Sequence, residues 1–104
     1  MRTLEDYYDY FKDVEGLKAL YCIHIETKKI QSKIVDANHN KSSALSSIKS
    51  LSNYIKRGEF EMMYIEELSN NMFIKNILSE DIILVISVDK SITIGTIFNI
   101  LKKL

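Results

Sequence analysis

The chain has 104 residues, of which 46% are hydrophobic and 27% charged, and its formal net charge at pH 7 is zero. This size and composition predict one folded domain over residues 1–104 and exclude an intrinsically disordered chain. With no net charge there is no general attraction to nucleic acid or anionic lipid, so we expect neither nucleic-acid binding nor membrane insertion. One cysteine, no signal peptide and no apolar run of transmembrane length lead us to expect a cytoplasmic protein.

The first third of the chain predicts a helix followed by a β-hairpin. Thr3 and Asp6 have the spacing of a capping box, and apolar residues then recur at helical spacing until the chain reaches Gly16. Residues 19–25 and 30–35 alternate in the manner of strands and are separated by a short polar turn, which predicts the hairpin. The second of these strands is polar enough to form an edge of a sheet.

A second helix is predicted over residues 41–57, with Asn40 as its N-cap and Gly58 directly after its end. One stripe of this helix is apolar and is expected to face the sheet. A neighbouring face carries mostly small residues, which would let another helix approach closely. This small face consists of Ser43, Ser47, Ser50 and Tyr54. The alternative is a serine face that is simply solvated, and the sequence leaves the two open.

Three further strands follow this helix. Residues 59–68 and 72–78 are predicted strands, joined by a tight turn at the two asparagines of positions 70–71. The run 82–88 is continuously apolar apart from one serine, and most of it is β-branched. Such a run predicts a central strand that is covered on both faces.

We therefore predict an α/β fold of three layers, α/β/α. The last helix, capped by Asp89 or Ser91, completes the element order α-ββ-α-βββ-α. Hairpin-linked strands must be antiparallel, because a parallel connection needs a longer crossover. The expected sheet has five mostly antiparallel strands in the order 2-1-5-4-3, with one helix on one face and two on the other.

The sequence pattern of the third predicted strand indicates self-association. It is apolar on both faces at its centre, yet the expected order places it at the end of the sheet. An unpaired strand of this kind is an aggregation hazard unless a second chain pairs with it, so we expect a homodimer. The predicted dimer interface joins this strand to the small face of the second helix, and comprises Ser43, Ser47, Ser50, Tyr54, Glu61, Met63 and Ile65.

Charge is distributed unevenly along the neutral chain. Residues 18–57 hold eight basic and two acidic side chains, whereas residues 59–81 hold one basic and six acidic ones. A basic face on the second helix would attract an acidic partner, and the predicted partner-binding residues are Lys41, Lys49, Lys56 and Arg57. The alternative is that oppositely charged faces complement each other within one fold.

Catalytic signals are almost absent from the sequence. It contains no phosphate-binding glycine motif, no H-E-x-x-H and no C-x-x-C. Cys22 and His24 share a face of the first strand, but two ligands are too few for a metal site, and packed strand residues are the better interpretation. We therefore expect no enzyme activity, no catalytic residue, no metal and no cofactor.

The layout as a whole resembles the roadblock/LC7 family, the dynein light chain type of domain. Residues 13–20 look like the family's passage from helix to first strand, and residues 60–88 look like its three-strand meander. Residues 91–97 look like the turn into its last helix, with Gly95 where the family has a glycine. The turn at 26–29 departs from the pattern, since the family often has Asp or Gly there and this chain has Glu-Thr-Lys-Lys.

The resemblance implies a dimeric regulatory or adaptor protein that binds a Ras-like small GTPase or serves as a scaffold subunit. It does not imply stimulation of GTP hydrolysis, because neither arginine, Arg2 or Arg57, stands in a motif suited to an arginine finger. PAS and profilin-like domains share parts of this layout, so a sensory or ligand-binding module is the alternative. Such a module needs a cavity with a few convergent polar groups, whereas the inward positions here are filled by large apolar residues.

Overall fold

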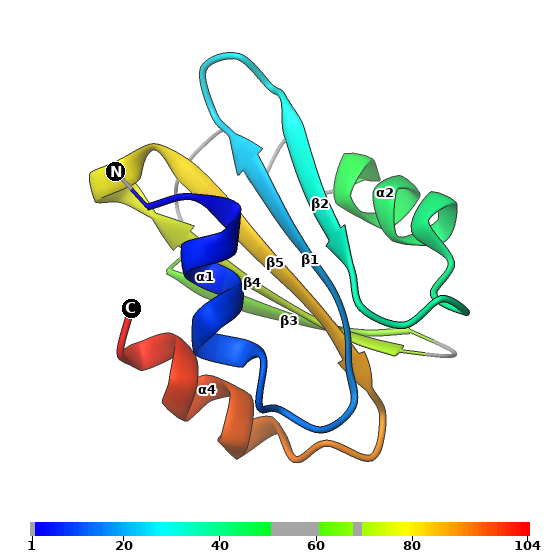
Figure 1. Ribbon diagram of the computed structural model, residues 1–104. Coiled ribbons are helices and arrows are strands. Elements are labelled where there is room, and N and C mark those ends of the chain that lie inside the picture. Colours follow the sequence, from blue (N-terminus) through cyan, green and yellow to red (C-terminus); the bar gives the residue numbers. More distant parts are fainter. Residues whose placement is uncertain (1, 51–60, 68–69) are drawn as a thin grey trace.

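A five-stranded antiparallel sheet forms the centre of the protein, as seen in a computed structural model that describes residues 2–50, 61–67 and 70–104 (Figure 1). The strand order is β2-β1-β5-β4-β3, and every neighbouring pair is antiparallel. The strands are β1 (Leu17–His24), β2 (Ile30–Ile34), β3 (Met62–Glu66), β4 (Asn70–Ile77) and β5 (Ile82–Asp89). The predicted sheet order is confirmed.

Helices cover both faces of this sheet. Helices α1 (Leu4–Phe11) and α4 (Ile94–Lys102) lie together on one face, and α2 (Lys41–Ser50) lies on the other (Figure 1). A short 3-10 turn, η1 (Leu78–Glu80), joins β4 to β5. This is the predicted α/β/α arrangement. The second half of the predicted second helix, residues 51–57, lies outside the described residues.

Two apolar cores account for this layering, one on each face of the sheet. On the α1 and α4 face the buried residues include Tyr7, Phe11, Leu20, Phe73, Leu84, Ile86, Ile97 and Leu101. On the α2 face they include Ala19, Tyr21, Ala44, Ile48, Met72, Ile74, Ile83 and Val85. β5 contributes alternate residues to both cores, and all its positions from Ile82 to Val88 are buried. The continuous apolar run is thus explained, because a strand between two cores has no solvent-facing side.

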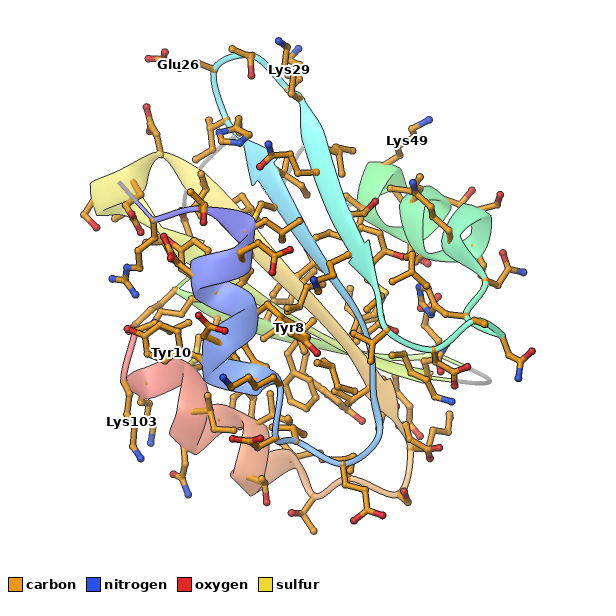
Figure 2. All side chains as sticks on the ribbon, in the orientation of Figure 1. Tyr8, Tyr10, Glu26, Lys29, Lys49 and Lys103 are labelled. Atoms are coloured by element: carbon orange, nitrogen blue, oxygen red, sulfur yellow. The ribbon has the colours of Figure 1, made fainter. Side chains whose placement is uncertain are left out.

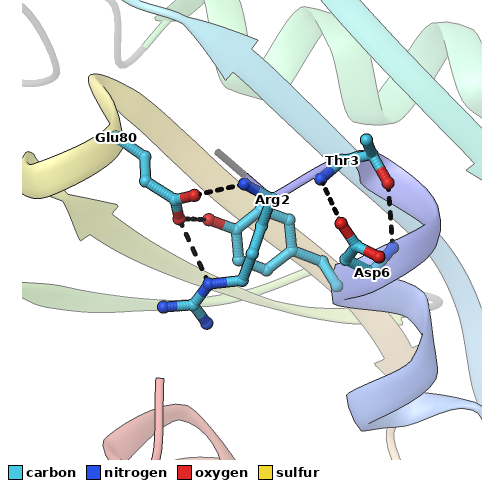
Figure 3. Close-up of polar contacts among 5 residues, drawn as sticks. Arg2, Thr3, Asp6 and Glu80 are labelled. Carbon is cyan, nitrogen blue, oxygen red and sulfur yellow. Dashed lines mark hydrogen bonds and ion pairs between the residues drawn. The ribbon is translucent and has the colours of Figure 1, made fainter.

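The N-terminus of α1 is fixed at two points. The Thr3 hydroxyl accepts a hydrogen bond from the Asp6 amide at 3.2 Å, and the Thr3 amide donates to the Asp6 carboxylate at 2.8 Å, so the predicted capping box is confirmed. Glu80 of η1 accepts hydrogen bonds from the Arg2 amide and from the Tyr7 hydroxyl, and it pairs with the Arg2 guanidinium at 3.4 Å (Figure 3). Although burial raises the pKa of Glu80, the bonds from Arg2 and Tyr7 bring it below its usual value.

Several element ends differ from the sequence prediction. α1 stops at Phe11, well before Gly16. The two asparagines at 70–71, predicted to form a turn, instead lie in β4, where they pair with Asp89 and Val88 of β5. β5 extends far enough to pair with both asparagines. Its backbone can therefore satisfy amide and carbonyl groups that would lack a partner in a turn. Of the predicted strand over 59–68, the structure shows β3, and residues 59, 60 and 68 lie outside the described residues.

The start of α4 also differs from the prediction. Its N-cap is Thr93, rather than Asp89 or Ser91. The Asp89 carboxylate instead accepts a hydrogen bond from the Ser91 amide at 3.0 Å, which stabilises the turn before the helix.

Candidate functional site

β3 and helix α2 form the candidate site. β3 ends the sheet, and within the part of the chain that the structure describes it pairs only with β4. Met62 and Tyr64 pack against the core on the α1 and α4 face, and Met63 and Ile65 pack against the core on the α2 face. All four side chains are half-buried. The predicted combination of an edge position with apolar side chains on both faces is therefore present.

The serines of the predicted small face are not equivalent. Ser43 and Ser50 are exposed, whereas Ser47 is half-buried and donates a hydrogen bond from its hydroxyl to the Glu67 carboxylate at 2.6 Å. Ser47 therefore connects α2 to the segment directly after β3, and only part of its surface is open to another molecule. Glu61, which was also predicted to belong to the interface, directly precedes β3, and its side chain is exposed. Tyr54 lies outside the described residues.

Two of the four predicted partner-binding residues are described. Lys41 and Lys49 stand at opposite ends of α2, and both are exposed. Neither forms an ion pair with a residue that the structure describes. Figure 2 shows Lys49 extending away from the body of the molecule. Lys56 and Arg57 lie outside the described residues.

A surface hollow of about 500 Å³ separates the start of α2 from the adjoining ends of β3 and β4. Its lining is Asn40, Ser43, Ala44, Ile65, Glu66, Glu67 and Asn70. The Asn40 side chain accepts a hydrogen bond from the Ser43 amide at 3.0 Å, as predicted for an N-cap. Glu66 pairs with Lys90 at 3.5 Å. Ser43 and Ile65 thus lie beside the same hollow, which brings together two elements of the predicted dimer interface.

The loop before α2 is held by two contacts that the sequence did not predict. The Tyr21 hydroxyl lies 2.5 Å from Nε2 of His39, and the Lys18 ammonium donates to the Asp36 carboxylate at 2.7 Å. Burial lowers the pKa of His39 and raises that of Tyr21 to about 12, while the hydrogen bond from Lys18 lowers the pKa of Asp36. These contacts fix the direction in which α2 begins. No spacing signal reveals them, because the partners come from different elements.

Metal-binding and thiol chemistry can be examined at the described residues. Residues 2–50, 61–67 and 70–104 contain no group of three or more His, Cys, Asp or Glu side chains that could hold a metal ion. Cys22 is buried, which raises its pKa to about 11 and keeps the thiol protonated at neutral pH. Among the described elements, no helix has both the length and the apolar character needed to cross a membrane.

The sheet order and the placement of the helices resemble those of the roadblock/LC7 fold. Two solved structures from Myxococcus xanthus share it. MglB is 18% identical with a TM-score of 0.61, over 91% of this chain and 81% of MglB, and MglC is 14% identical with a TM-score of 0.59, over 91% of this chain and 86% of MglC. No protein-family model matches the sequence, and no curated protein does. At these identities the likeness establishes the fold alone.

Proposed function

We propose that this chain is a non-enzymatic regulatory or adaptor protein that forms a homodimer and binds a Ras-like small GTPase. The observation that carries this proposal is a roadblock/LC7-like sheet ending in the half-buried β3 edge. Members of the family that this fold resembles are typically dimers that bind Ras-like small GTPases or serve as adaptor subunits.

Dimerisation is supported by the backbone of β3 together with its side chains. An edge strand presents unpaired amide and carbonyl groups, and a second copy related by a two-fold axis would pair with them. Met63 and Ile65 would then become more deeply buried on the α2 face. Helix α2 lies beside this edge, since Ser47 contacts Glu67 and Ser43 lines the same hollow as Ile65. Two copies of α2 would thus approach each other across the axis.

The exposed lysines of α2 support the proposal that the partner has an acidic surface. Lys41 and Lys49 are both exposed, so another protein can reach their ammonium groups. A dimer would bring two copies of this basic helix into one surface. Complementary charge raises the association rate more than it lengthens the lifetime of a complex, and salt weakens this effect.

Binding to a purified Ras-like GTPase from the same organism tests the proposal, with the GTPase loaded with GDP or with a non-hydrolysable GTP analogue. Lys49→Glu should slow association, and added salt should weaken the wild-type complex. Lys29→Glu is the matched control, because Lys29 is also an exposed lysine but belongs to the turn between β1 and β2 rather than to α2 (Figure 2).

Equal association rates for Lys49→Glu and Lys29→Glu would place the GTPase elsewhere on the molecule. Failure to bind any such GTPase in either nucleotide state would refute the proposed partner. A small molecule that copurifies with the protein and is released on unfolding would favour the sensory-module alternative.

A further inference from the structure

A second concave surface lies on the opposite face of the sheet from α2, between the end of α1 and the start of α4. It is a groove of about 540 Å³. The half-buried side chains of Val14, Ile92 and Ile100 give it an apolar component. Its remaining lining residues are polar or aromatic, and they are Tyr10, Asp13, Glu15, Ser91, Thr93 and Thr96. All of these residues belong to the described chain.

Close packing of two loops holds this groove in shape. Gly16 has a φ of +92°, and a Cβ at this position would lie 2.8 Å from the Ile92 side chain. The Asp89 amide donates to the Gly16 carbonyl at 2.8 Å, and the Ile92 amide donates to the Asp89 carbonyl at 3.1 Å. The loop before β1 is therefore bonded to the last residue of β5, where the loop that carries Ile92 begins. A preformed groove loses little conformational entropy when it binds a ligand.

The charge of the groove is one-sided. Its lining contains two carboxylates, from Asp13 and Glu15, and no lysine or arginine. Both residues are exposed, and neither forms an ion pair with a residue that the structure describes. The nearby Lys12 is engaged with Asp9 at 3.7 Å. The groove therefore offers apolar contact beside two carboxylates that form no ion pair with a described residue.

We propose that this groove is a docking site for a cationic segment of a partner protein, one aliphatic side chain of which packs against Val14, Ile92 and Ile100. Lysine or arginine residues flanking that side chain would pair with Asp13 and Glu15. The groove lies on the other face of the sheet from α2, so a partner here leaves α2 accessible. The protein would then be able to connect two different partners.

A labelled peptide with one leucine flanked on both sides by lysines is a suitable probe, measured by fluorescence anisotropy against its counterpart with glutamate at every lysine. The cationic peptide should bind and the acidic one should not. Glu15→Lys should weaken binding at least about fivefold because it reverses a charge. Thr96→Arg should weaken it by a similar factor because the arginine side chain would occupy the groove. Glu26→Lys and Thr27→Arg are the matched controls, because both residues are exposed in the turn after β1.

Amide chemical shifts locate the bound peptide, with the largest changes expected at Val14, Gly16, Ile92 and Thr96. Thermal melting checks that each variant is folded. Absence of binding, equal weakening by groove and control variants, or shifts confined to α2 would each overturn the proposal. A change in sedimentation with Thr96→Arg would also overturn it, because the occupant would then be a second copy of this chain.

Discussion

The ammonium group of Lys75 donates a hydrogen bond to the backbone carbonyl of Leu101 at 2.7 Å. Lys75 is on β4 and is only 8% exposed, while Leu101 is in the last turn of α4. The last carbonyl groups of a helix lack partners within it and carry partial negative charge. A buried lysine thus finds a suitable acceptor, and β4 is joined to the C-terminal end of α4.

The sign of the charge at position 75 should therefore control stability. Lys75→Glu places a buried carboxylate against the negative end of α4, and it should lower the free energy of unfolding by about 3 kcal/mol or more. Lys75→Met keeps most of the buried aliphatic stem and should cost about 1 kcal/mol. Urea unfolding measures both. Exposed Lys29 is the control, and a loss from Lys75→Glu no greater than that from Lys29→Glu would contradict the assignment.

Stability should fall on mild acidification because of His39. Burial lowers the pKa of His39 below its ordinary value, so the unfolded chain takes up the proton first as the pH falls. The stability that neutral His39 contributes is fully present above about pH 6.5 and is lost progressively below it. Unfolding titrations from about pH 7.5 to pH 5 should show this loss in the wild type, and His39→Gln should flatten it. His24→Gln is the control, and an unchanged profile for His39→Gln would refute the role of His39.

The fold could be predicted because its signals are local. The continuous apolar run 82–88 indicated a strand between two layers, and Thr3 and Asp6 indicated where α1 begins. The contacts that shape the candidate site depend on the tertiary arrangement instead. Ser47 was assigned to a helix face from periodicity, but the structure directs its hydroxyl to Glu67. No periodicity in the sequence could have predicted that bond.

Replacing Gly16 or Gly95 by alanine should change the stability of the protein in opposite directions. Gly16 has a positive φ and lies against Ile92, so Gly16→Ala should lower the free energy of unfolding by about 1–3 kcal/mol. Gly95 lies in α4, and a Cβ there meets no atom within 4 Å. Gly95→Ala should raise the free energy of unfolding by about 0.4–1 kcal/mol, because alanine reduces the entropy of the unfolded chain. Chemical denaturation decides, and a stabilising Gly16→Ala would show that the loop relaxes freely.

The proposed dimer can be tested at Ser43, which is the better choice than Ser47 because it is exposed and remains clear of the bond to Glu67. Ser43→Arg would place a cation opposite its own symmetry copy and should raise the dimer dissociation constant roughly tenfold or more. Ser46→Arg is the matched control, since Ser46 is an exposed serine of α2 outside the small face. Sedimentation of the three proteins at micromolar concentration should show a dimer for the wild type and Ser46→Arg, and mainly monomer for Ser43→Arg. A wild-type monomer would refute the dimer itself, whereas three equally stable dimers would place the two-fold axis away from the small face.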